Sequence, residues 1–473
     1  MKILNRIAAT ACLFGAVLLV SCESPDLSTA HESQVNGLLN VTIQIPDNPT
    51  EFYATKKGPY EEGEEITVKV PTTDEDPLDV SRLICTVSVE HNCYVETPLT
   101  GETDFTEPLK ITVIDVQGNR HNNTIKILPT PPKTKFAKLW DKNSVELNIN
   151  DRNLTGLAMT EKGLAVQVYD GNIFRYDRKT GSGLDIVPSA RSFMMKADVD
   201  DAGHLITARE NVYGAGFMVY YYSEEDKEHH LLLDYTDGDG CPEDMGYEMS
   251  VIGDVTKGKS FIYGIAPSMM NIYYWELMDG ELVTPANEPI ILRYGPAGAN
   301  WDRAQVQRAS LDGNSDHYIS FYTPSSDDAD DEYRKEKKGS RFNIFSPYMD
   351  INELNPQNHS YKILDFKVFT VNEDVFLATI EQNYSAWGNA KVQVFEITNR
   401  NKMELTAEDA GYDELCLFTG EEIAPTNYNR WGDISIYKEQ TATGYDVYIA
   451  STVVGYDATE SRIRMYKMSY YPQ

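Results

Sequence analysis

The chain has 473 residues, of which 73 are Asp or Glu and 42 are Lys or Arg, and its formal net charge is -31. Such a charge repels nucleic acids, so binding to DNA or RNA is excluded as the main function. The length predicts two or three domains. Tyrosine is frequent, with 30 residues, and its amphipathic ring suits half-buried β-strands and ligand surfaces.

The N-terminus has the pattern of a bacterial lipoprotein signal peptide. A short basic region precedes the apolar run 7–20, which is too short to span a bilayer. The run ends in Leu19-Val20-Ser21-Cys22, which has the form of a lipobox, where a peptidase cleaves before the cysteine and the thiol receives a diacylglycerol. An ordinary signal peptide with a chance cysteine is the alternative. We therefore expect a signal peptide over 1–21 and a mature chain that is attached to the membrane through lipid on Cys22.

The mature chain begins with a tether and a small β domain. Residues 22–35 are polar and without periodicity, which predicts a flexible tether. Within residues 36–129, polar and apolar side chains alternate as in half-buried strands, over 41–45, 66–70, 85–89, 111–114 and 124–127. A domain of about 95 residues with this pattern is typical of an immunoglobulin-like sandwich. Residues 130–135 form a proline-containing linker.

Four cysteines follow the signal peptide, and none has the Cys-x-x-Cys spacing of a zinc site: Cys85, Cys93, Cys241 and Cys416. The bacterial envelope permits disulfides. Cys85 and Cys93 lie in one strand-turn-strand stretch, so both a disulfide and a reduced, partly buried pair stay open.

A strand pattern repeats over residues 136–473. Each unit has an alternating strand, a polar turn, a second apolar strand, a variable loop and an aromatic-rich third strand. Ile206, Ile262, Ile319 and Phe376, at matching points of four second strands, are 56, 57 and 57 residues apart. A repeating unit of this size is typical of β-propeller blades, and six units are present. We therefore predict an all-β chain with an immunoglobulin-like sandwich followed by a six-bladed propeller; a long sandwich or solenoid is the alternative.

The last unit ends soon after its third strand and needs a fourth. The segment Val145–Ile149 alternates and stands just before the first unit. We expect it to complete the last blade, because such closure leaves no open edge strand.

Five short motifs resemble those of a known family: residues 176–181, 200–204, 300–302, 314–318 and 386–390. Their order and spacing are similar to Bacteroides-type lipoproteins of unknown function, in which an immunoglobulin-like domain precedes a propeller-like region. The resemblance implies an outer-membrane location, with the cell surface or the periplasmic face as the side. It also implies association with an outer-membrane glycan-uptake complex. The family supplies no catalytic residues to carry over.

No enzyme signature is present in the sequence. The motifs His-Glu-x-x-His and Gly-x-Ser-x-Gly and the phosphate-binding loop are all absent. The acidic stretch 234–244 has the oxygen ligands that calcium prefers, but Gly246 stands where an EF-hand has its last Glu. A solvated acidic loop is the alternative. We therefore expect no cofactor and no catalytic residue, with calcium left open.

The aromatic residues are distributed unevenly between the two rims expected of a propeller. Turns between first and second strands are small and polar, whereas the loops of the opposite rim carry large rings: Tyr213, Tyr247, Trp301, Trp387, Trp431 and Tyr456. Asn389 and Asp433 stand two residues after Trp387 and Trp431. Flat rings suit the apolar faces of sugars, and the neighbouring polar groups suit their hydroxyls. Rings that only wedge between blades are the alternative.

Together these patterns predict a lipid-anchored surface protein that captures a carbohydrate without catalysis. An adhesion or scaffold module without a small ligand is one alternative. A propeller glycan lyase or hydrolase is another, and it requires convergent carboxyl groups with shifted pKa values in the central pocket.

Overall fold

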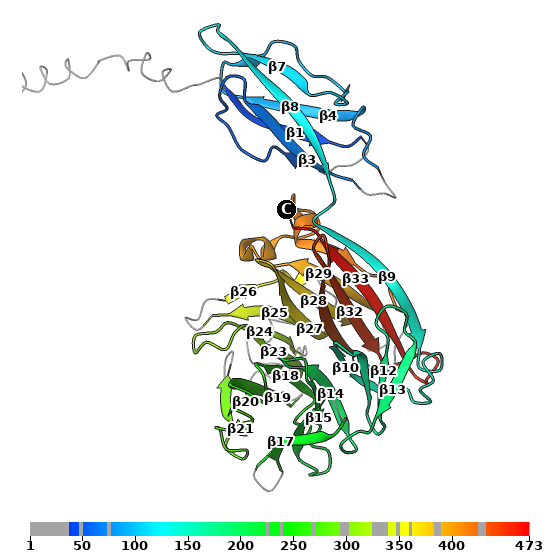
Figure 1. The fold of residues 1–473 in the computed structure, drawn as a ribbon. Coiled ribbons are helices and arrows are strands. Elements are labelled where there is room, and N and C mark those ends of the chain that lie inside the picture. The colour runs from blue at the N-terminus through cyan, green and yellow to red at the C-terminus, as the bar shows by residue number, and fades with distance from the viewer. Residues whose placement is uncertain are drawn as a thin grey trace, which may run out of the picture. The chain divides into compact units, whose positions relative to one another are not determined.

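The computed structural model is almost entirely β, which confirms the predicted fold class (Figure 1). It describes residues 37–46, 51–72, 77–223, 227–236, 240–266, 271–293, 302–323, 339–346, 351–358, 362–382, 389–423 and 432–472. In these ranges no helix is long and apolar enough to cross a bilayer. The chain divides into two compact units, residues 1–132 and 133–473. The predicted signal peptide over 1–21, Cys22 and the predicted tether over 22–35 lie outside the described residues.

Within its described residues, the first unit has two four-stranded sheets. One sheet has the order β2-β1-β4-β6, with β1 (Leu38–Gln44), β2 (Glu51–Tyr53), β4 (Leu83–Val89) and β6 (Glu102–Thr103). The other has the order β3-β8-β7-β5, with β3 (Glu65–Pro71), β5 (Tyr94–Val95), β7 (Leu109–Ile114) and β8 (Arg120–Thr130). β3 and β8 are parallel, and the other pairs are antiparallel. All five segments predicted as strands lie within or overlap these elements.

Alternation places the core of the first unit between its sheets. Val41 and Ile43 of β1 and Val68 of β3 are fully buried, whereas the residues between them are less buried or exposed. Cys85 and Cys93 belong to the same core and are both free thiols. Burial raises the pKa of the Cys85 thiol to about 12, so this cysteine is an unreactive core residue.

The second unit contains six sheets within the described ranges, and in five of them the strands follow one another in sequence. The first sheet has the strands β10 (Leu154–Thr160), β11 (Gly163–Val168), β12 (Ile173–Tyr176) and β13 (Gly183–Val187). The second has the strands β14 (Met194–Val199), β15 (Leu205–Arg209), β16 (Phe217–Tyr222) and β17 (His229–Tyr235). The third is β18 (Glu248–Ile252), β19 (Lys259–Ile265), β20 (Asn271–Met278), with β21 (Glu281–Leu282) and β22 (Ile290–Arg293) both on β20.

The remaining sheets continue this pattern until the last one. The fourth is β23 (Asp302–Arg308), β24 (His317–Thr323), β25 (Gly339–Phe345), β26 (Ile351–Glu353), and the fifth is β27 (Lys362–Val371), β28 (Asp374–Gln382), β29 (Ala390–Glu396), β30 (Cys416–Thr419). The sixth is β31 (Gly432–Gln440), β32 (Tyr445–Val453), β33 (Arg462–Tyr470) and, from the start of the unit, β9 (Thr134–Asn143).

The strand that completes the sixth sheet is β9, and the prediction of Val145–Ile149 was wrong. β9 pairs with the whole length of β33, from Asn143 opposite Arg462 to Thr134 opposite Tyr470. Val145–Ile149 instead forms a turn in which the Ile149 amide donates to the Ser144 carbonyl. Its alternation reflects two side chains, Leu147 and Ile149, that the turn buries. Closure by the N-terminal strand of the unit is as expected, but the segment is different.

The six first strands form a closed ring. β10, β14, β18, β23, β27 and β31 contact one another in this order, and β31 contacts β10. Figure 1 shows β10, β14, β18, β23 and β27 gathered in the middle of the second unit, with β13, β17, β21 and β26 at its periphery. At Gly156 of β10 an added Cβ would lie 2.5 Å from the Ala197 nitrogen of β14, so glycine permits this close approach.

Hydrogen bonds between a side chain of one inner strand and the backbone of the next join all six steps of this ring. Inner strands have no further strand to pair with, and their backbone groups need other partners. The bonds are Thr155 Oγ1 to Met194 O (3.1 Å), Val251 N to Asp198 Oδ2 (3.2 Å), Ser250 Oγ to Val306 O (2.6 Å), Val368 N to Gln307 Oε1 (2.8 Å), Ile434 N to Asp365 Oδ2 (3.2 Å) and Leu157 N to Asp433 Oδ2 (2.6 Å). Polar residues on the inner strands therefore hold the ring closed.

Candidate functional site

Five of the six inner strands place a polar side chain in one buried layer at the centre of the ring. These residues are Lys196 (β14), Glu248 (β18), Gln305 (β23), Asp365 (β27) and Asp433 (β31), and each is at most 2% exposed. We call these five residues the inner layer. The residues that follow each of them, such as Ala197 and Phe366, are buried and apolar, as the two-residue period of a strand requires.

Ion pairs and amide bonds connect the members of the inner layer. The Lys196 Nζ lies 2.8 Å from Glu248 Oε2 and 3.7 Å from Asp433 Oδ1. The Gln305 Nε2 donates to Asp365 Oδ1 at 3.0 Å and to Glu248 Oε2 at 3.3 Å. One ammonium group thus faces several carboxyl groups, so the charges balance only if some of these carboxyl groups keep their protons.

The pKa values in the inner layer follow from this imbalance. Burial raises the pKa of the Glu248 carboxyl group to about 8, against the opposing charge of Lys196. Burial also raises the pKa of Asp433 well above its usual range, and the hydrogen bond to Asp365 acts in the same direction. Burial opposes the ionisation of Asp365, but the hydrogen bond from Asp433 and the charge of Lys196 lower its pKa overall. The two aspartates therefore titrate as a pair, with the pKa of Asp433 raised and that of Asp365 lowered.

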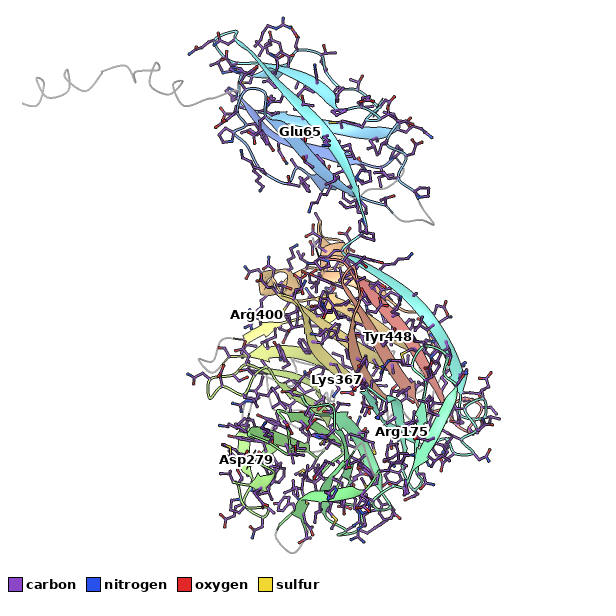
Figure 2. All side chains as sticks on the ribbon, viewed as in Figure 1. Glu65, Arg175, Asp279, Lys367, Arg400 and Tyr448 are labelled. Atoms are coloured by element: carbon purple, nitrogen blue, oxygen red, sulfur yellow. The ribbon has the colours of Figure 1, made fainter. Side chains whose placement is uncertain are left out.

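A second layer lies two residues further along the same strands. Here Asp198 of β14 and Lys367 of β27 form an ion pair of 2.7 Å between the second and the fifth sheets of the ring, which lie on opposite sides of its axis. Figure 2 shows Lys367 in the middle of the second unit, whereas Arg175, Asp279 and Arg400 lie toward its outside. Burial disfavours the charge of Lys367, but the carboxylates of Asp198 and Asp365 raise its pKa to about 12. This pair crosses the centre of the ring.

The cross-axis pair belongs to the lining of a cavity of about 460 Å³. Its walls come from the ends of five inner strands and the turns after them: Asp198, Val199, Asp201, Ser250, Val251, Ile252, Gln307, Arg308, Ala309, Ser310, Leu311, Lys367, Val368, Phe369, Thr370, Ser435, Ile436 and Lys438. We call it the central pocket. A volume of this size accommodates a small ligand, and a mixed apolar and polar lining is typical of ligand sites. The inner-layer residues are not part of the lining.

Two neighbouring turns are fixed together beside the central pocket. Asp200 Oδ2 accepts hydrogen bonds from the Val255 amide at 2.9 Å and from His204 Nδ1 at 2.8 Å, and Asp201 Oδ2 accepts one from the Gly253 amide at 2.9 Å. Asp200, His204 and Asp254 bring three ligand atoms within 4.8 Å of one another, so they are the described residues that could hold a metal ion. The carboxylate of Asp200 already accepts hydrogen bonds from these donors, so its role is to hold the two turns together.

The residues predicted as a binding rim are only partly described. Tyr213 is 89% exposed and Tyr456 is 46% exposed, both on loops between second and third strands as expected. Tyr247 is buried. Trp301, Trp387 and Trp431 lie outside the described residues, as do the central residues 237–239 of the predicted calcium-binding stretch.

The two polar residues assigned to the rim have partners within the protein. Asn389 donates to Glu422 Oε2 at 2.6 Å. Asp433 is 2% exposed and accepts the Leu157 amide inside the inner layer, so it is a ring-closing residue and does not face solvent. At Gly432, which precedes Asp433, an added Cβ would lie 2.6 Å from the Leu364 side chain, so glycine permits this close approach. The glycine beside Trp431 thus has a packing role.

Sequence reasoning missed the inner layer and the central pocket. The signal was a polar residue at alternate positions of segments assigned as first strands, as in Lys196-Ala197-Asp198 and Asp365-Phe366-Lys367. Alternation of this kind also describes a strand with one face in water. Only the partners on other strands, such as Gln305 for Asp365 across 60 residues of sequence, show that these polar groups are buried.

Comparison with known proteins gives a family but no activity. Residues 138–458 match the family model described as Domain of unknown function (DUF8500), and because this match covers more than half of the chain, the chain belongs to that family. No curated protein matches the sequence. A solved structure, Kuenenia stuttgartiensis Hydrazine Synthase, is similar with a TM-score of 0.34 and 8% sequence identity, covering 84% of this chain and 94% of that chain. A likeness of this degree carries no functional argument.

Proposed function

We propose that the second unit is a six-bladed β-propeller that captures a carbohydrate in its central pocket without chemical turnover. One observation carries the proposal: the inner strands join into a closed ring, and a cavity of about 460 Å³ lies over the Asp198–Lys367 pair at its centre. Hydroxyl, amide and charged side chains stand beside apolar ones such as Phe369 and Ile436. Sugars present both hydroxyl groups and apolar ring faces, so they match such a lining.

The positions of the shifted carboxyl groups favour binding over catalysis. A glycan lyase or hydrolase needs carboxyl groups that reach the substrate. Glu248, Asp365 and Asp433 are at most 2% exposed and do not line the pocket. Asp198 lines it but is held by Lys367 and by the Val251 amide. A structural role in closing the ring accounts for these groups.

Hydrolysis remains the second candidate because of Asp201. Its carboxyl group lines the pocket, and partial burial together with the charges of Asp200, Asp198 and Asp254 raises its pKa. A carboxyl group with a raised pKa suits a general acid. If the chain is a hydrolase, bound oligosaccharide is cleaved over time and Asp201→Asn abolishes the cleavage; if it is a capture protein, the oligosaccharide is recovered intact.

The cellular setting that we propose comes from the sequence. Lipid on Cys22 would anchor the chain in the outer membrane, and the first unit, as an immunoglobulin-like spacer, would hold the propeller away from it. Capture at the surface fits a part in an outer-membrane glycan-uptake complex. The predicted aromatic rim, with Trp387 and Trp431, is a second candidate surface for the ligand, and loss of binding in a chain with a blocked pocket would favour the central pocket over it.

A blocking substitution tests the pocket directly. Ala309 is exposed and lines the pocket, so Ala309→Trp fills its mouth without disturbing a buried contact. Ala202→Trp, at an exposed turn that does not line the pocket, is the matched control. We expect Ala309→Trp to abolish binding of the full chain to a glycan panel and Ala202→Trp to preserve it. Binding that survives in Ala309→Trp, with melting unchanged, would place the ligand elsewhere and contradict the proposal.

A further inference from the structure

The central pocket concentrates positive charge in a strongly acidic chain. Arg308, Lys367 and Lys438 line it from β23, β27 and β31, three successive inner strands of the ring, whereas the formal net charge of the chain is -31. The acids of the lining, Asp198 and Asp201, both come from β14 and the turn after it. One side of the pocket is therefore cationic and the other acidic.

Bonds within the protein already engage the acidic side. Asp198 Oδ1 accepts from the Val199 amide at 2.9 Å and from Lys367 at 2.7 Å, and its Oδ2 accepts from the Val251 amide at 3.2 Å. Asp201 Oδ2 accepts from the Gly253 amide, and neighbouring acids raise the pKa of Asp201. Hydrogen bonds and Lys367 thus compensate the negative charge of Asp198, and the raised pKa of Asp201 reduces the negative charge of that group.

The cationic side keeps donor capacity. A lysine ammonium has three N–H donors, and the bonds described for Lys438 use one of them, to the Thr370 carbonyl at 3.2 Å. Lys367 gives one to Asp198. The Arg308 guanidinium donates to the Ser310 carbonyl at 2.7 Å, and its positive charge is part of the pocket wall. The charges of Lys367 and Asp198 cancel each other. The other charged groups of the lining are Arg308 and Lys438, which are positive, and Asp201, which is negative.

We infer that the central pocket selects an anionic saccharide, whose carboxylate or sulfate group lies against Lys438 and Lys367. The inference rests on the proposed carbohydrate capture and adds the class of sugar. A neutral sugar would leave the positive charge of this wall without a counter-charge, whereas an acid group supplies one and accepts charge-assisted hydrogen bonds. The focused field of a concave, cationic site also attracts an anion in spite of the negative net charge of the protein.

Matched pairs of sugars test the inference by calorimetry on the full chain. The probes are an oligogalacturonate, the same oligosaccharide after reduction of its carboxyl groups, and a sulfated galacto-oligosaccharide. We expect at least one acidic probe to bind at least tenfold more tightly than the reduced one, and this preference to fall as salt is raised. The carboxylated and sulfated probes identify which acid group the pocket prefers.

Substitutions assign the preference to the pocket. Lys438 is exposed, so Lys438→Met keeps its stem and should remain folded; we expect it to reduce affinity for the acidic probe about tenfold and to leave affinity for the neutral probe unchanged. Lys162→Met, at the exposed β10–β11 turn that does not line the pocket, is the control and should change neither affinity. The pair Asp198→Asn with Lys367→Met removes both buried charges together and should also reduce the preference.

The outcomes separate this inference from the proposed function. Equal binding of acidic and reduced sugars, blocked by Ala309→Trp, would overturn the charge preference and leave carbohydrate capture standing. A preference that Lys438→Met and Lys162→Met reduce equally would be a general charge effect, which overturns the assignment to the pocket. Binding of none of the three sugars would contradict both.

Discussion

Replacing Lys196 by methionine tests whether the buried charges hold the ring together. The Lys196 side chain is 2% exposed and that of Glu248 is 1% exposed, and their charged atoms lie 2.8 Å apart. Methionine fills a similar volume but leaves Glu248 and Asp433 without the ammonium group that lies beside them. Loss of one partner of a buried ion pair costs about 3–5 kcal/mol of unfolding free energy.

The expected shift in melting follows from the size of the unit. With an unfolding entropy of about 2 cal/mol/K per residue, a unit spanning residues 133–473 melts about 4–7 °C lower for a loss of this size. Thermal unfolding followed by near-UV circular dichroism measures this shift. The deficit should grow as pH rises, because removing the ammonium raises the pKa of Glu248 further and ionisation becomes more costly in the folded state.

A double substitution supplies the control. Lys196→Met combined with Glu248→Gln removes the ammonium group and the carboxyl group together and keeps an amide oxygen that can accept from Gln305, so we expect it to recover most of the lost stability. If Lys196→Met melts within 1 °C of the parent chain, the inner layer does not stabilise the ring and the reasoning fails. If the double variant is as unstable as the single one, volume and not charge explains the loss.

Four further outcomes are expected. Glu248 has a folded pKa above its unfolded one, so its contribution is present below about pH 4.5 and is lost as pH rises through about 8; over this range the unfolding free energy falls by up to ~1.4 kcal/mol per pH unit, and Glu248→Gln should remove this part of the slope. Deleting Thr134–Asn143 should unfold the second unit, whereas deleting 23–132 should leave its melting unchanged. Cys22→Ala should abolish palmitate labelling and detergent partitioning, and labelling that persists would refute the lipid anchor. If the predicted rim holds the glycan, Trp387→Ala and Trp431→Ala should each weaken binding on the order of tenfold, whereas a glycan held in the central pocket is bound unchanged; a sharp drop in melting with intact affinity would make both rings structural.

The strands of both units were predictable because their physics is local. Alternation set the positions of β1, β3 and β4 in the first unit, and the recurring apolar second strands, such as those around Ile206 and Ile262, set the positions of strands in the second. These patterns need only the immediate neighbours of each residue. The recurring spacing near 57 residues then followed from the similar size of successive sheets.

The closing strand was missed for a physical reason that the sequence hides. β9 covers Thr134–Asn143, where Thr, Lys and Asp interrupt the apolar residues, and its burial pattern is mostly intermediate. Such an outer strand faces neither a full core nor open water, so its pattern is weak. Val145–Ile149 alternates more clearly only because a turn buries Leu147 and Ile149. Pairing with β33, more than 300 residues away, decided between the two segments.

The same distinction explains why the sequence predicted an aromatic rim and did not predict the central pocket. Aromatic residues are visible in a sequence, and the rim was predicted from them alone. A central pocket needs the side chains of different sheets to meet, and the Asp198–Lys367 pair joins residues 169 positions apart. Each polar residue by itself has the pattern of a solvent-facing strand position, and the cost of burying it is acceptable only because a partner of opposite charge arrives from across the ring. Buried polar residues on inner strands are therefore a consequence of ring closure, and the pocket over them follows from the number of sheets that share one axis.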